Sequence, residues 1–197
     1  MSPVRRVLGL DPGLQITGYG LLECGGHGIR VAEAGVIRSQ AGPDPDLNHL
    51  ADRLKSLYDG LVELLEQWRP TAIAVEQLYA HREHPRTAIL MAHARGCFFL
   101  AGAQRTIPVV SYPSTQVKKT ITGHGRASKA QMQAAIRREL NLARLPQPHD
   151  VADALAIALC HCFASGVAVH GSLNAVYTGV NLKKLLGDAA TEQSEGG

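Results

Sequence analysis

A leucine repeat of helical spacing stands between two apolar, strand-like segments, and this order constrains the fold more than any other feature. Leucines recur at steps of three and four residues from Leu47 to Trp68, which predicts one amphipathic helix, begun at Asp44–Pro45–Asp46. The segment Thr71–Glu76 after it is apolar until its last residue, as in interior strands covered by helices. A right-handed crossover through the helix brings this strand parallel to the first strand, residues 4–10.

The rest of the chain predicts an α/β domain with a five-stranded mixed sheet flanked by helices. Residues 16–24 and 29–38 have strand patterns and are joined by a glycine-rich hairpin turn. A fifth strand is predicted at residues 107–111, and further helices at residues 86–104, 113–121, 129–140 and 149–164. The helix 86–104 is apolar nearly all round, which indicates that it is either deeply buried or shared with a second subunit. We expect one domain over residues 1–165 and a partly disordered extension over residues 166–197.

The expected location is the cytoplasm. No stretch approaches the roughly 20 apolar residues that a membrane span needs, and no apolar leader of a signal peptide is present. The four cysteines lack the paired spacing of zinc sites and do not resemble a secreted disulfide framework. Cys160, His161 and Cys162 are neighbours on a helix and point in different directions, so they cannot easily converge on one ion. We therefore expect buried core cysteines.

The net charge of +3 is small, but the basic residues are concentrated in one segment. Between Leu100 and Arg144, eight basic residues oppose a single acid, Glu139. Such a concentration is the electrostatic footprint of a phosphate-backbone partner, although a solvated helix face is the commoner fate of Lys and Arg. Charge alone leaves both interpretations open.

Carboxylates from distant segments stand at strand and helix ends. Asp11 ends the first strand, Glu76 ends the fourth, and Asp150 and Asp153 open the last helix. Each position has a simpler interpretation: turn chemistry for Asp11, a solvated strand end for Glu76, and an N-cap with a first-turn acid for the helical pair. One fold would nevertheless bring all of them to the carboxyl ends of the parallel strands, where α/β sheets bind ligands. Clustered carboxylates hold pairs of hard divalent cations, Mg²⁺ or Mn²⁺, for phosphodiester hydrolysis.

Taken together, these segments resemble the RuvC Holliday-junction resolvase family. The resemblance runs in order from about residue 4 to residue 165 and rests on the runs Gly9–Leu10–Asp11–Pro12–Gly13, Thr17–Gly18–Tyr19–Gly20, Ala74–Val75–Glu76–Gln77, Gln116–Val117–Lys118 and His149 to Ala158. It implies a ribonuclease H-like fold, a homodimer, and paired nicking of four-way DNA junctions that depends on two Mg²⁺ or Mn²⁺ ions per active site. It also implies 5′-phosphate products and a place in DNA recombination and repair beside the RuvA–RuvB branch-migration complex.

The resemblance assigns the family's four metal-binding catalytic acids to Asp11, Glu76, Asp150 and Asp153. Asp11, at the centre of the sheet, best suits a ligand that bridges both ions. The family's third acid position varies between aspartate and histidine, so His149 beside Asp150 could also approach a metal.

The resemblance also implies a DNA-binding surface. Tyr79 takes the place of an aromatic residue that stacks on a base near the cut, with Tyr instead of the more familiar Phe. Lys118 and Lys129 match basic positions that contact the DNA backbone near the cut. The same surface is extended by Lys119, Arg126, His81 and Arg82.

Other functions share parts of this pattern. A ribonuclease H-like nuclease acting on structured RNA would carry the same acids, but the two helices with Lys118 and Lys129 favour the junction enzyme. A junction-binding protein that does not cleave gains nothing from negative charge facing DNA. An ATP-binding actin-like or sugar-kinase domain also uses Asp-x-Gly after its first strand, yet it needs two such domains and a far longer chain.

Overall fold

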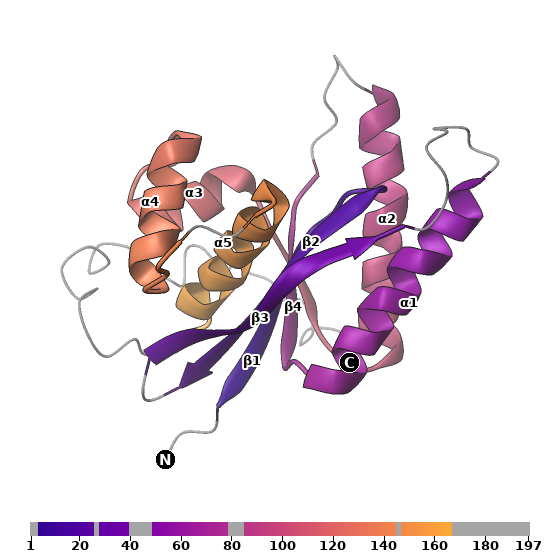
Figure 1. Ribbon diagram of the computed structural model, residues 1–197, viewed down its shortest axis with the longest axis horizontal. Coiled ribbons are helices and arrows are strands. Elements are labelled where there is room, and N and C mark those ends of the chain that lie inside the picture. The colour runs from indigo at the N-terminus through magenta and orange to yellow at the C-terminus, as the bar shows by residue number, and fades with distance from the viewer. Residues whose placement is uncertain (1–3, 26–27, 40–48, 79–84, 145–146, 167–197) are drawn as a thin grey trace, which may run out of the picture.

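The computed structural model describes residues 4–25, 28–39, 49–78, 85–144 and 147–166. They form a five-stranded mixed sheet with helices on both faces (Figure 1). In spatial order the strands are β3 (Gly28–Arg38), β2 (Ile16–Gly25), β1 (Arg5–Asp11), β4 (Ala72–Glu76) and β5 (Val109–Tyr112). β1, β2 and β3 pair antiparallel, whereas β4 is parallel to both β1 and β5. The predicted α/β class, mixed sheet and crossover are therefore confirmed.

The helices lie in two layers, one on each face of the sheet (Figure 1). One layer holds α1 (Leu50–Trp68) and α2 (Pro85–Gln104), and the other holds α3 (Ser114–Thr122), α4 (Lys129–Glu139) and α5 (His149–Ala164). A hydrophobic core lies on each face of the sheet. β1 contributes side chains to both, because successive residues of a strand point to opposite faces. Leu8 and Leu10 pack with α1 and α2, whereas Val7 packs with α5.

Glycines let α5 lie directly against β1 and β2. A Cβ atom at Gly9 would stand 2.7 Å from the Ala158 backbone nitrogen, and one at Gly18 would stand 2.9 Å from the Asp150 Cβ. Any larger residue at these positions would therefore push the helix off the sheet. This close contact sets the height of the α5 N-terminus above the strand ends.

Most element bounds agree with the sequence, and one strand differs for an identifiable reason. β5 begins at Val109 rather than at residue 107. Pro108 has no N–H to donate and only its carbonyl joins the sheet edge, accepting from the Ile73 N–H at 2.9 Å. The expected start of α1 at residues 44–46 lies outside the described residues.

One side of α2 remains uncovered. Ala94, Phe98 and Ala101 are buried against the sheet, while the side chains of Ile89 and Leu100 are 57% and 53% exposed. Of the two predicted roles for this helix, complete burial is therefore wrong in this chain, and the contact with a second subunit stays a prediction. None of the described helices is long and apolar enough to cross a membrane.

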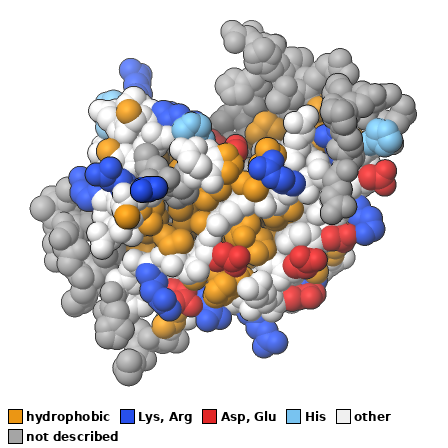
Figure 2. Space-filling model, in the orientation of Figure 1, with side chains coloured by type: hydrophobic (Ala, Val, Ile, Leu, Met, Phe, Trp, Pro, Cys, Tyr) orange, Lys and Arg blue, Asp and Glu red, His pale blue; other side chains and the backbone are white. Residues whose placement is uncertain are grey.

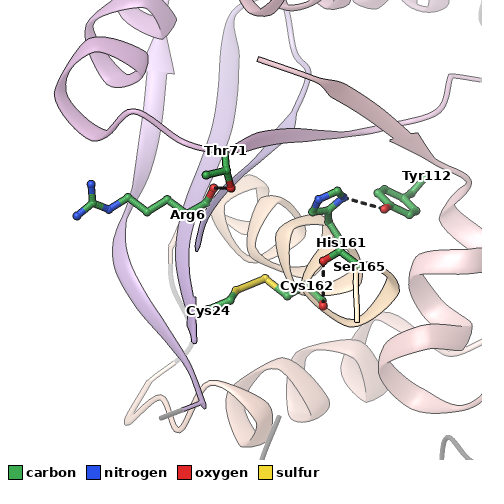
Figure 3. The surroundings of a disulfide bond; sticks show 7 residues. All are labelled: Arg6, Cys24, Thr71, Tyr112, His161, Cys162 and Ser165. Carbon is green, nitrogen blue, oxygen red and sulfur yellow. Dashed lines mark hydrogen bonds between the residues drawn. A yellow bond between two sulfur atoms is a disulfide. The ribbon is translucent and has the colours of Figure 1, made fainter. Parts of the chain in front are cut away.

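The cysteines are only partly as predicted. Cys24, Cys160 and Cys162 are buried as predicted, but Cys24 of β2 and Cys162 of α5 also form a disulfide that was not predicted from the sequence (Figure 3). Their sequence separation of 138 residues hides the pairing from any local motif. The neighbours on α5 do point apart, as predicted: the His161 Nδ1 lies 2.8 Å from the Tyr112 hydroxyl (Figure 3).

Candidate active site

The end of the parallel pair β1–β4 places two carboxylates side by side. Leu10 is paired with Val75 in the register of the two strands, so the next residues along each, Asp11 and Glu76, emerge as neighbours at their carboxyl ends. Leu10 and Val75 are buried on the face covered by α1 and α2. Because successive residues of a strand point to opposite faces, the side chains of Asp11 and Glu76 point toward α5. Asp11 and Glu76 are only partly buried, and therefore open to solvent.

The N-terminus of α5 brings two more carboxylates to the same place. The Asp150 backbone lies against Gly18, and Gly18 is the β2 partner of Asp11. Asp153 lies three residues further on, on the same side of the helix. The N-cap position belongs to Pro148, which makes no side-chain cap, so the interpretation of Asp150 as an N-cap is wrong. Both acids lie inside the helix.

The charges of these carboxylates act on one another. Burial, together with the nearby negative charges of Asp153, Glu76 and Asp150, raises the pKa of the Asp11 carboxyl from 3.8 to about 7. The positive charge of Lys129 opposes this rise in the pKa. A central carboxyl with so high a pKa lies in a partly buried concentration of negative charge that a bound cation would relieve.

Two lysines from the neighbouring helices border this cluster. Burial raises the pKa of Glu76 and so does the Asp153 charge, while Lys118 of α3 and a hydrogen bond with Ser114 lower it. Burial likewise raises the pKa of Asp153, against the opposing charges of Lys129 and Lys118. Both lysines that the sequence predicts at the DNA backbone are therefore close enough to interact with the acids.

The donor set fits hard divalent cations. The four side chains of the cluster offer only carboxylate oxygens, the ligands that Mg²⁺ and Mn²⁺ prefer. Within the described residues, however, no three His, Cys, Asp or Glu side chains are arranged as a ready-made metal site. The acids are thus gathered and mutually repelling, and a bound cation would have to draw them closer.

Of the other predicted site residues, His149 lies near the acids, where its charge lowers the pKa of Asp153. The exposed His149 has its Nδ1 3.2 Å from the Gln133 side-chain amide of α4. Lys119 and Arg126 are exposed on and after α3. Tyr79, His81 and Arg82 lie outside the described residues.

Sequence reasoning missed Ser114 and Gln133. Ser114 opens α3 beside Glu76, and Gln133 holds the His149 ring from a neighbouring helix. Neither residue type stands out in a sequence, because only the tertiary fold brings them to the site. The sequence does show glycines at alternate positions, Gly18 and Gly20, so both lie on one face of β2. This pattern could have indicated that a helix packs closely against that face.

Comparison with known proteins identifies the family. The family model for crossover junction endodeoxyribonuclease RuvC matches residues 7–161. The chain belongs to this family. The curated RuvC of Rhodopirellula baltica is 46% identical over 154 residues, which cover 78% of this chain and 84% of that protein. The RuvC of Thermomicrobium roseum is 46% identical over 158 residues, covering 79% and 91% of the two chains.

Solved RuvC structures share the fold. The structure of Thermus thermophilus RuvC has 32% sequence identity and a TM-score of 0.72, covering 83% of this chain and 98% of its own. The same protein in complex with Holliday junction substrate gives 32% identity and a TM-score of 0.71, covering 82% and 94%. The predicted ribonuclease H-like fold and RuvC membership are thus both confirmed.

Proposed function

We propose that this protein is a structure-selective endonuclease that resolves four-way DNA junctions by paired hydrolysis of phosphodiester bonds in recombination and repair. The observation that carries the proposal is the gathering of carboxylates around Asp11, bordered by two lysines, in a member of the RuvC family. In this proposal the catalytic acids are Asp11, Glu76, Asp150 and Asp153.

The same four acids are proposed to hold two Mg²⁺ or Mn²⁺ ions. When bound, such ions lower the pKa of the attacking water and neutralise the leaving oxygen. Asp11 suits a ligand shared by both ions, because the charges of all three other acids act on it. His149 has one ring nitrogen beside Gln133, so only its other nitrogen is free to face a ligand.

Lys118 and Lys129 are proposed to attract the phosphate backbone to this edge of the sheet. They supply positive charge beside acids that would otherwise repel DNA. Their place next to the carboxylates also holds the scissile strand where the attacking water forms, since correct positioning contributes much of the rate of hydrolysis. Tyr79, Lys119, Arg82 and Arg126 are proposed to extend the contact with DNA.

A homodimer is proposed to form through α2. Its exposed side carries apolar or small residues at steps of three and four, namely Ile89, Ala92, Gly96, Leu100 and Ala103. Nothing lies within 4 Å of the position of a Cβ at Gly96, so a partner helix can approach the backbone there. A second copy of the chain would cover this stripe and place two active sites for the two cuts.

We expect Leu100→Asp to convert the dimer into a monomer. An unpaired carboxylate buried in an apolar interface costs about 3–5 kcal/mol, which corresponds to at least about 100-fold weaker association. Analytical ultracentrifugation measures the change, with Val4→Asp as control, because Val4 is 60% exposed and lies just before β1, away from α2 in the chain. A Leu100→Asp protein that stays dimeric at the wild-type concentration would contradict this interface.

The nuclease domain is proposed to comprise residues 1–165, with residues 166–197 as an extension. The proposed location is the cytoplasm. RuvA and RuvB are proposed as partners, because junctions must be moved to sites of cleavage.

The test is a cleavage assay on a synthetic four-way junction, beside a duplex of matching sequence and an RNA hairpin. We expect cuts only in the junction, paired across it, dependent on added Mg²⁺ or Mn²⁺, and leaving 5′-phosphates. Cleavage of the RNA hairpin would instead support the structured-RNA nuclease. Tight junction binding without cuts would support the non-cleaving junction-binding protein.

A further inference from the structure

A groove of about 570 Å³ runs along α4 and is not part of the carboxylate cluster. The small side chains of Ala130 and Ala134 leave its floor open, and Gln133 and Arg137 line it together with Arg138. The helix is anchored from its other side, where Met132 and other side chains are buried in the core. The groove is therefore a fixed feature of the α4 surface.

One row of side chains connects this groove to the catalytic acids. Lys129, Gln133 and Arg137 are spaced four residues apart and share one side of α4. Lys129 interacts with Asp11 and Asp153 at one end of the row. In the middle, the Gln133 amide nitrogen lies 3.2 Å from His149 Nδ1, next to Asp150.

The start of α4 is held in a way that fixes this row. Ser128 and Gln131 form a capping box: the Gln131 N–H donates to the Ser128 hydroxyl, and the Ser128 N–H donates to the Gln131 side chain. A capped first turn fixes the backbone from which Lys129 projects.

The groove carries a positively charged side chain that is available to bind a ligand. Arg138 forms an ion pair with Glu139 at 2.8 Å, whereas the exposed Arg137 guanidinium makes no hydrogen bond or ion pair within the described part of the chain. Lys and Arg side chains also gather over the α3–α4 side of the molecule, away from the acidic side chains near α1 (Figure 2). An unpaired guanidinium in a basic region suits a phosphate group.

We propose that the α4 groove holds the sugar–phosphate backbone of the DNA strand that leaves the carboxylate cluster, with Arg137 contacting a phosphate and Gln133 guiding the strand between. The inference rests on the proposed junction cleavage and adds the path of the strand. Residues 129 and 137 are about 12 Å apart along a helix that rises about 1.5 Å per residue. Arg137 therefore contacts a phosphate within a few nucleotides of the cut.

The test compares Arg137→Gln with the wild-type protein in junction binding across a salt series. Removal of one phosphate contact should lower the slope of log affinity against log salt by about 0.9 and weaken binding several-fold. Arg5→Gln is the matched control, because Arg5 is exposed at the opposite end of β1 from Asp11. Its slope should equal that of the wild type.

A second measurement locates the contact. Junctions are made with an uncharged methylphosphonate at each of the first four phosphates from the cut in turn. At one of these positions the methylphosphonate should weaken binding to the wild-type protein but should not weaken binding to Arg137→Gln. If Arg137→Gln keeps the wild-type slope, or if both proteins respond equally to the uncharged phosphate, the strand path is overturned while junction cleavage by the wild type still stands. A wild-type protein that binds no junction overturns both proposals.

Discussion

Asp11→Asn should lose at least about 1,000-fold in the rate of junction cleavage, because it removes the carboxylate shared by the whole cluster. Junction binding should be kept or strengthened, since one negative charge facing the phosphates is gone. Single-turnover cleavage and a binding titration in Ca²⁺ or EDTA separate the two effects. Cleavage at the wild-type rate would contradict the assigned role.

The same substitution should stabilise the metal-free protein at neutral pH. The pKa of Asp11 is raised from 3.8 to about 7, so between these values the folded protein binds more protons than the unfolded chain. Its stability therefore falls as the pH rises through that window, and the full penalty is present above pH 7. At about 1.4 kcal/mol per pH unit, Asn should recover up to about 4 kcal/mol of the free energy of unfolding at pH 8.

Denaturant unfolding at pH 5 and pH 8 in EDTA measures this gain. Asp59→Asn is the control, because Asp59 is an exposed carboxylate on α1 paired with Lys55. The control should show little change at either pH. An Asp11→Asn protein that is no more stable than wild type at pH 8 would show that burial and the neighbouring charges do not raise the pKa of Asp11.

Gly18→Ala should lower the cleavage rate about 100-fold without changing any acid. The added Cβ would lie 2.9 Å from the Asp150 Cβ and even closer to the Asp150 carbonyl, so the start of α5 must move away from β2. A displacement of about 1 Å at reacting groups is enough to lose about 100-fold in rate. Overpacking should also lower the free energy of unfolding by about 1–3 kcal/mol.

Gly25→Ala provides the matched control in the same strand. The nearest atom to a Cβ at Gly25 is 3.7 Å away, which is an ordinary contact. This variant should fold and cleave as the wild type does. Equal cleavage by Gly18→Ala and Gly25→Ala would show that the contact between α5 and β2 does not position the acids.

The sequence predicted the sheet and the grouping of acids because both follow from local patterns joined by one topological rule. Apolar strands that end in Asp11 and Glu76, with a helix between them, leave a parallel pair with adjacent ends. The assignment of Asp150 as an N-cap failed because Pro148 takes that position, and a helix start is uncertain by a residue or two in any sequence pattern.

Features made by contacts between distant elements could not be predicted. The Cys24–Cys162 disulfide and the Gln133–His149 contact join segments that no short motif connects. The sequence also could not show that one side of α2 is uncovered. An apolar helix has the same composition whether its own core or a second subunit covers it.

The central claim is that acids far apart in the sequence form one site for a pair of cations. Titration calorimetry with Mn²⁺ on the wild-type protein, Asp11→Asn and Asp59→Asn tests it without any DNA. Two ions per chain should bind to the wild type and to Asp59→Asn, and at most one, more weakly, to Asp11→Asn. An Asp11→Asn protein that binds the same number of ions with the same affinity as the wild type would contradict the claim.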